Sequence, residues 1–191
     1  MVKLNKIYTR TGDDGTTGLV DGSRTSKHSL RIAAVGAVDE TNSAIGLAIC
    51  ALSQADHAAT LNRVQNDLFD LGADLATPAQ DAEFTPSEMV LRMVPGQAQW
   101  LEAQIDALNE GLEPLTSFVL PGGSEAAARI HVGRASARAA ERAMTSLADD
   151  TAVNPAALMY INRLSDLLFV MARLANNGGA SDVKWIPGAN R

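Results

Sequence analysis

Apolar residues recur every three or four positions along several stretches of this chain, and the first of these covers residues 29–52. The only gap in its pattern is position 42, where asparagine stands in place of an apolar residue. This spacing puts the apolar side chains on one face of a helix. We therefore predict a long amphipathic helix over residues 29–52. Its apolar positions are Ile32, Val35, Val38, Ile45, Ile49 and Leu52.

The same spacing predicts two more helices before the middle of the chain. Residues 61–75 repeat it, and Thr77-Pro78 ends that helix because the residue before a proline disfavours the helical conformation. Residues 78–95 contain several prolines, which indicates a connection with one extended stretch. A further helix is expected over residues 96–111, where glycine marks its end.

Two helices are predicted for the second half of the chain. The first covers residues 124–147, after the loop LTSFVLPGG, with Ser124 as its N-cap. The second starts after Asn154-Pro155, which are suited to the N-cap and the first helical position, and ends at Asn177-Gly178-Gly179.

Five helices with short connections predict an all-α fold, an up-and-down five-helix bundle. We treat residues 1–191 as a single domain, because a chain of this length buries one sizeable core. The N-terminal segment, residues 1–28, precedes the bundle of residues 29–178. The tail of residues 179–191 lacks periodicity, so we expect it to fray or to dock locally.

Composition narrows the classes of partner. The net charge of −6 argues against a broad nucleic-acid surface, so an anionic ligand must meet a local cluster of cations. The single cysteine, Cys50, has apolar neighbours, which favours a buried, inert thiol and a reducing compartment. No apolar run is long enough for a signal peptide or a membrane span. We therefore expect a cytoplasmic protein that binds neither nucleic acid nor membrane.

The segment TRTGDDGTT, residues 9–17, is unusually polar and rich in glycine for a helical protein. Gly12, Gly15 and Gly18 permit positive φ, and successive backbone N–H groups in such turns can hold an anion. Threonine hydroxyls, Arg10 and Lys27 would add donors. A flexible hairpin or a disordered arm is the alternative interpretation. The segment matches neither a Walker A loop nor a dinucleotide-binding turn.

A row of charged residues follows one face of the predicted 124–147 helix. Arg134, Arg138, Glu141 and Arg142 lie at helical spacing among alanines, so a ligand or another helix could approach them closely. A solvated charged face is the alternative.

Polar residues also interrupt the apolar faces of two other predicted helices. The last helix carries Asn162, Asp166, Phe169 and Arg173 in one stripe, and pairing of Asp166 with Arg163 or Arg173 within that helix is the alternative to a ligand site. The first helix carries Asp39, Glu40 and Asn42 beside its apolar face. An aspartate there is a natural salt-bridge partner for the arginine row.

Several other kinds of site are excluded by spacing. No histidine follows a glutamate by three residues, as a di-iron bundle requires. The three histidines and Cys50 show no zinc-like spacing, and His131 is expected to be a packed or hydrogen-bonded residue.

Five motifs in order resemble the PduO-type ATP:cob(I)alamin adenosyltransferases. They are TRTGDDGTTGL, VGAVDETNSAIG, FVLPGG, RASARAAER and INRLSDLLFVMAR, and the resemblance spans roughly residues 7–176. It implies a homotrimer of five-helix bundles with active sites between subunits. It also implies the reaction, in which cobalt(I) of the corrinoid attacks the 5′-carbon of ATP, giving adenosylcobalamin and releasing triphosphate.

The resemblance also implies the roles of individual residues. Arg138 and Phe118 are expected to act in catalysis, Arg138 on the phosphates and Phe118 by displacing the lower axial ligand of cobalamin. Asp39 and Arg134 would pair across subunits. Phe118, Asp166 and Phe169 would contact the corrinoid. The residues implied for ATP are Thr9, Arg10, Thr11, Gly12, Asp13, Gly15, Thr17, Lys27, Arg138, Glu141 and Asn162.

The implied cofactor is Mg²⁺ carried by ATP, held mainly by water and phosphate oxygens. A flavin-type reductase and an adenosylcobalamin-dependent acceptor enzyme are the further partners expected. Two other functions stay open at this point: a carrier that binds ATP and cobalamin without turnover, and a purely structural bundle.

Overall fold

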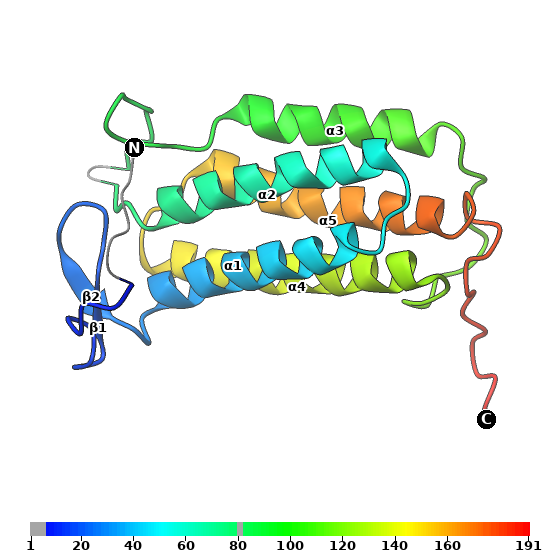
Figure 1. The fold of residues 1–191 in the computed structure, drawn as a ribbon, viewed down its shortest axis with the longest axis horizontal. Coiled ribbons are helices and arrows are strands. Elements are labelled where there is room, and N and C mark those ends of the chain that lie inside the picture. Colours follow the sequence, from blue (N-terminus) through cyan, green and yellow to red (C-terminus); the bar gives the residue numbers. More distant parts are fainter. Residues whose placement is uncertain (1–6, 80–81) are drawn as a thin grey trace.

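The computed structural model describes residues 7–79 and 82–191, and its core is a bundle of five helices. The helices are α1 (Leu30–Ile49), α2 (Ala55–Leu75), α3 (Pro95–Asn109), α4 (Glu125–Asp150) and α5 (Pro155–Ala175). They run alternately up and down the long axis of the molecule (Figure 1). The predicted all-α bundle is confirmed. Residues 1–6 of the predicted N-terminal segment and residues 80–81 lie outside the described parts.

Side-chain caps begin three of the helices, and two of these caps, Ser124 and Asn154, were predicted. The side chain of Ser29 accepts from the Ile32 amide at the start of α1, and Ser124 does the same for the Ala127 amide of α4. Asn154 caps α5 through the Ala156 amide, at 3.0 Å. These side chains satisfy amide groups that have no partner within the first helical turn.

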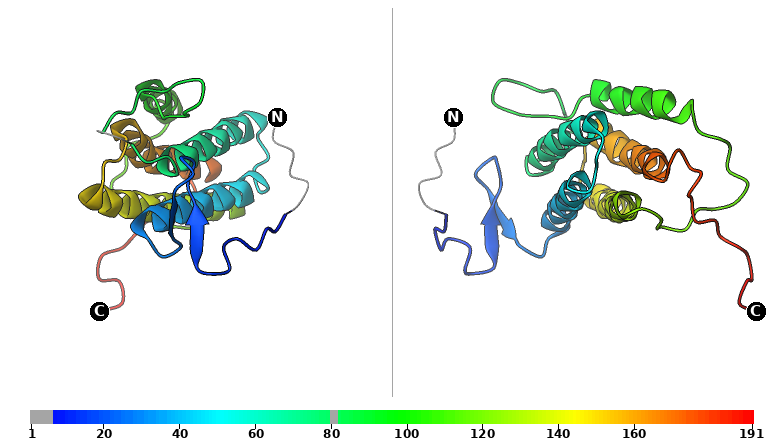
Figure 2. Two further views of the ribbon diagram at one scale, coloured as in Figure 1. Left: turned by 90° about the vertical axis from the view of Figure 1, so that its left-hand side faces the viewer. Right: turned by 45° about the vertical axis from the view of Figure 1, so that its right-hand side comes forward.

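The spatial order of the helices differs from their order in the chain. α1 packs against α2 and α4, α5 packs against α4 and α3, and α3 lies at the edge of the bundle (Figures 1 and 2). Long connections before and after α3 permit this arrangement, whereas short ones were expected. Within residues 82–94, the connection before α3 forms no strand, so the extended stretch expected there is not present as regular structure.

The bundle core consists of the predicted apolar faces. Ile45, Leu61, Leu101, Ile130 and Leu164 are fully buried in it. By length and composition α1 is also apolar enough to cross a membrane, but it lies in the bundle against α2 and α4.

Cys50 is exposed, which corrects the expectation of a buried thiol. α1 ends at Ile49, so Cys50 is the C-cap residue and leaves the periodic face that its neighbours continue.

A two-stranded hairpin precedes the bundle. β1 (Thr16–Gly18) and β2 (Arg24–Ser26) pair antiparallel, with Thr17 opposite Thr25. The hairpin lies at one end of the bundle, whereas the loop before α4 and the C-terminal tail lie at the other end (Figures 1 and 2). α4 alone is about 39 Å long at 1.5 Å per residue. Within one subunit, the hairpin is therefore far from the loop before α4.

Candidate functional site

The polar segment of residues 9–17 forms a compact turn that leads into the hairpin. The Lys27 ammonium donates to the Gly12 carbonyl at 2.7 Å, and the Arg24 guanidinium donates to the Thr11 carbonyl at 2.6 Å. The Asp14 carboxylate accepts from both the amide and the hydroxyl of Thr16, which lowers the pKa of this carboxyl. These bonds give the segment a defined shape.

Glycine has two different roles in this turn. Gly15 has a φ of 83°, as a left-handed turn requires, but Gly12 and Gly18 do not have positive φ, which corrects that expectation. Gly12 is required for space instead, because a Cβ there would lie 3.0 Å from both Lys27 Nζ and the Thr16 carbonyl oxygen. Arg10 takes a left-handed conformation, with φ of 65°.

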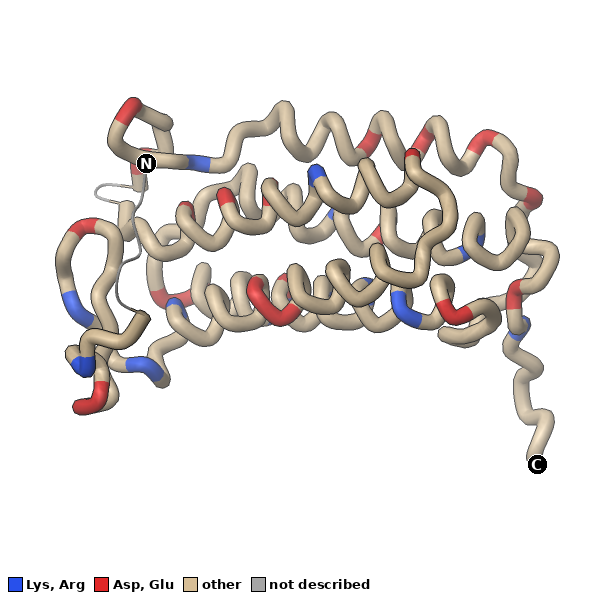
Figure 3. The backbone as a smooth tube through the Cα atoms, viewed as in Figure 1, with Lys and Arg blue, Asp and Glu red and all other residues tan. Residues whose placement is uncertain are grey.

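Basic side chains gather at this end of the molecule. Arg10, Arg24 and Lys27 lie on or beside the turn and the hairpin, and all three are exposed. The backbone at this end carries several basic positions, together with acidic ones (Figure 3). Lys27 uses one of its three donors on Gly12, so the other two remain for a ligand. The arrangement suits a polyanion.

The charged row on α4 contains residues with very different surroundings. Arg138 is exposed, and its guanidinium makes no hydrogen bond or ion pair with any residue that the structure describes. Arg142 is also exposed but donates to the Arg138 carbonyl at 3.0 Å. Arg138 is thus an available cation on an exposed face of α4, with Ala135 one helical turn before it.

Glu141 and Asn162 are brought together across α4 and α5. The Asn162 amide nitrogen donates to Glu141 Oε1 at 2.7 Å, while Asn162 Oδ1 accepts from Arg163 at 2.6 Å. Arg163 in turn bonds Glu102 on α3 at 2.8 Å. This chain of polar side chains fixes the orientation of Asn162 against Glu141, which lies one helical turn after Arg138 on α4.

Asp166 pairs with neither arginine of its own helix, so the intrahelical alternative is wrong. Arg163 bonds Glu102, and Arg173 bonds Asp182 of the tail at 2.9 Å. Asp166 is exposed.

An aromatic cavity lies beside the N-terminal half of α4, away from the hairpin. It has a volume of about 600 Å³, and Phe118, Arg134 and Phe169 are among the residues that line it. The Phe118 side chain is 77% exposed, although a phenyl ring normally gains by burial. Burial lowers the pKa of Arg134, and nearby Arg138 lowers it further, although the group stays a cation. The cavity therefore combines apolar walls with one cation.

The C-terminal tail holds the Phe118 loop in place. The Trp185 amide donates to the Phe118 carbonyl at 2.8 Å, and the Ser117 hydroxyl donates to the Trp185 carbonyl at 2.7 Å. The rings of Phe118 and Trp185 are 5.9 Å apart. Fraying and local docking were the two expectations for the tail, and these contacts show that it docks. Sequence reasoning missed Trp185, whose only signal was a tryptophan in a segment without periodicity.

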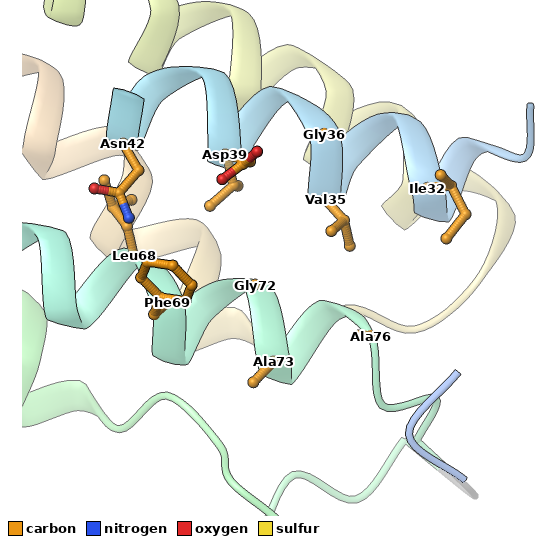
Figure 4. A pocket seen from close by; sticks show the side chains of 11 residues that line it. Ile32, Val35, Gly36, Asp39, Asn42, Leu68, Phe69, Gly72, Ala73 and Ala76 are labelled. Carbon is orange, nitrogen blue, oxygen red and sulfur yellow. The ribbon is translucent and has the colours of Figure 1, made fainter. Parts of the chain in front are cut away.

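Asp39 lies in a separate groove between α1 and α2 (Figure 4). The groove has a volume of about 460 Å³ and mainly apolar walls, among them Val35, Phe69 and Ala73. Asp39 is exposed, and no ion pair joins it to Arg134 within the described chain. An exposed carboxylate in an apolar groove suits a protein surface that carries one cation.

Comparison with known proteins identifies the family. The cobalamin adenosyltransferase family profile matches residues 7–175. A corrinoid adenosyltransferase of Mycobacterium leprae is 49% identical over 98% of both chains. The corrinoid adenosyltransferase PduO of Citrobacter freundii is 43% identical over 87% of this chain and 49% of its own length.

Solved structures agree with this result. A variant PduO-type ATP:corrinoid adenosyltransferase from Lactobacillus reuteri, complexed with cobalamin and ATP, superposes with a TM-score of 0.87 at 35% identity. The match covers 95% of this chain and 97% of that one. The chain therefore belongs to the cobalamin adenosyltransferase family.

Proposed function

We propose that each active site of this enzyme lies between two subunits of a homotrimer. The activity, ATP-dependent adenosylation of cobalamin, is that of the family. The N-terminal turn of one subunit and the α4–α5 face of the next together form the site. The turn lies at one end of the bundle, whereas Arg138 lies near the middle of α4, and this separation within one chain supports the arrangement (Figure 1). The Asp39 groove would receive Arg134 of the neighbouring subunit.

The turn and α4 supply the groups that hold ATP. Lys27, Arg10 and the backbone amides of the turn bind the triphosphate from one side, and Arg138 binds it from the other. Glu141 and Asn162 hold the rest of the nucleotide. Among the described residues, no three acidic, histidine or cysteine side chains form a metal site. We propose that Mg²⁺ enters with ATP, with phosphate and water oxygens as its ligands.

The chemistry needs alignment and charge stabilisation rather than a general base. Cobalt(I) attacks the 5′-carbon of ATP, the bond from carbon to the triphosphate oxygen breaks, and the leaving group gains negative charge. Arg138 stabilises that charge with the donors of its guanidinium. Phe118, Phe169 and Asp166 surround the corrinoid, and the exposed Phe118 ring takes the place of the lower axial ligand of cobalt.

Electrons for cobalt(I) must come from a donor outside this chain, and the product must pass to an enzyme that uses it. A flavin-type reductase and an adenosylcobalamin-dependent acceptor are the classes of partner that we propose. A cytoplasmic setting stays a prediction.

The available guanidinium of Arg138 is the observation that carries this proposal. Arg138→Ala should lower kcat at least about thirtyfold, which corresponds to about 2 kcal/mol of transition-state stabilisation, and should leave the oligomeric state unchanged. The measurement is the spectral change from cob(I)alamin to the light-sensitive adenosyl product. Arg142→Ala is the matched control, because Arg142 is exposed on the same helix but donates to the Arg138 carbonyl of that helix. Equal activity of the two variants would contradict the assignment of Arg138.

A further inference from the structure

His131 is a polar side chain in a buried position of α4. The residue is only 3% exposed, and its ring lies 6.4 Å from the ring of Phe169, a wall of the aromatic cavity. One ring nitrogen, Nδ1, accepts a hydrogen bond from Arg134 Nε at 3.2 Å. The other, Nε2, is buried and has no partner among the residues that the structure describes. An unpartnered buried polar atom costs stability, so packing alone does not explain a histidine here.

The ring is neutral and carries its proton on Nε2. Burial lowers the pKa of His131, and the Arg134 cation lowers it further. The carboxylate of Asp182 acts in the opposite direction but is itself paired with Arg173. Because Nδ1 accepts from Arg134, the single ring proton must lie on Nε2.

The hydrogen bond determines what Arg134 can offer to a ligand or a neighbour. It occupies Nε, and the two terminal nitrogens make no hydrogen bond or ion pair with any described residue. A guanidinium held by Nε presents its terminal nitrogens as a fork that fits a carboxylate.

We propose that His131 is a positioning residue, which holds the Arg134 guanidinium so that its terminal nitrogens point out of the subunit. The inference rests on the proposed pairing of Arg134 with Asp39 of the neighbouring subunit. His131 contacts neither substrate nor the reacting atoms in this account. It acts only through Arg134.

A double-mutant cycle tests the proposal. His131→Leu keeps an apolar body but removes the acceptor, and it should lower both trimer stability against dilution and kcat/KM about tenfold or more. In an Arg134→Met background the same change should cost less than twofold, because the interaction is already lost. If the losses from His131→Leu are equal in the two backgrounds, His131 is a packing residue and the proposal is wrong.

Two amide variants provide matched controls. His131→Asn places an amide oxygen near the position of Nδ1 and should restore most of the loss, whereas His131→Gln places the same group one methylene further out and should not. If Asn and Gln behave alike, the position of the acceptor does not matter and the proposal fails.

A measurement on the unaltered protein does not depend on activity. The chain contains three histidines, so the ¹⁵N signals of His131 can be assigned by comparison with His131→Asn. We expect an unprotonated Nδ1 and a protonated Nε2, and the reverse tautomer would overturn the proposal. If the tautomer and the cycle agree with this account but Arg138→Ala keeps full activity, the catalytic assignment fails while the positioning role stands.

Discussion

Phe118 shows how one residue can be placed against its own solvation preference. Its ring is mostly exposed at the mouth of a cavity, yet Trp185 holds the loop by donating to the Phe118 carbonyl and accepting from the Ser117 hydroxyl. A strained or mobile loop is therefore not needed to expose the ring. An apolar group fixed in this way can fill the space of a departing axial ligand and exclude water from it.

Replacing Phe118 with alanine should therefore affect the two forms of the substrate differently. Without the lower ligand, cobalt(II) is easier to reduce, so loss of the ring should impair turnover of cob(II)alamin with a reductase at least about tenfold more than turnover of pre-reduced cob(I)alamin. Steady-state rates in the two assays measure this difference. Trp185→Phe, which keeps an aromatic ring beside Phe118, is the control. Equal losses in both assays would remove ligand displacement as the role of Phe118.

At the scale of elements, the hairpin and the turn before it depend on a close approach of the Lys27 side chain to the backbone at Gly12. Gly12 lets the Lys27 ammonium reach the Gly12 carbonyl, and a Cβ at that position would meet both Lys27 Nζ and the Thr16 carbonyl oxygen.

Gly12→Ala should consequently raise KM for MgATP by about tenfold or more, because the added methyl group displaces the Lys27 ammonium that we propose binds phosphate. Gly18→Ala is a well-matched control, since Gly18 has an ordinary φ and no atom within 4 Å of an added Cβ. Saturation kinetics in MgATP give both values. The prediction fails if the two glycine variants have the same KM.

The connection before α3 is tied to the bundle by a buried ion pair. Arg92 donates to Asp74 Oδ1 at 2.7 Å, and the other oxygen of Asp74 accepts from the Met93 amide and from Asn154. The side chains of Arg92 and Asp74 are 4% and 2% exposed. The loop is thus fixed to the end of α2 and to the cap of α5.

Arg92→Met should destabilise the protein by about 3–5 kcal/mol, because it leaves the Asp74 carboxylate buried with no countercharge. The exposed pair of Arg129 and Glu125 is the comparison, and Arg129→Met should cost at most about 1 kcal/mol. Urea unfolding monitored by circular dichroism measures both changes. A cost for Arg92→Met no larger than that for Arg129→Met would show that the buried pair does not hold the connection.

At the scale of the whole molecule, the sequence predicted what depends on local pattern. Helical spacing and the predicted caps Ser124 and Asn154 located the five helices, since each signal lies within a few residues of its effect. The sequence also led us to expect Glu141 and Asn162 in the same site, and their side chains are hydrogen bonded in the fold.

Features that depend on distant parts of the chain were not predictable in this way. The order of helices in space, the docking of Trp185 on Phe118 and the bond between His131 and Arg134 all follow from packing. The predicted burial of Cys50 was wrong because its apolar neighbours do not indicate where the helix ends. The roles of Lys27, Arg138 and Asp39 came from family resemblance and remain proposals.

Separation of the hairpin from the loop before α4, which lines the aromatic cavity, is the whole-molecule feature on which the account depends most (Figures 1 and 2). If each active site takes its turn from one subunit and its α4 face from the next, two different inactive subunits can complement each other. A trimer that mixes a Lys27→Ala subunit with an Arg138→Ala subunit contains one interface at which both residues are intact.

The most direct test is to co-assemble these two variants and measure adenosylation of cob(I)alamin. Each variant alone should be nearly inactive, and random mixed trimers at equal amounts should regain about a quarter of the wild-type activity, because about a quarter of the interfaces then carry both residues. Activity of the mixture equal to the mean of the two separate variants, with mixed trimers verified by mass spectrometry, would contradict a site shared between subunits.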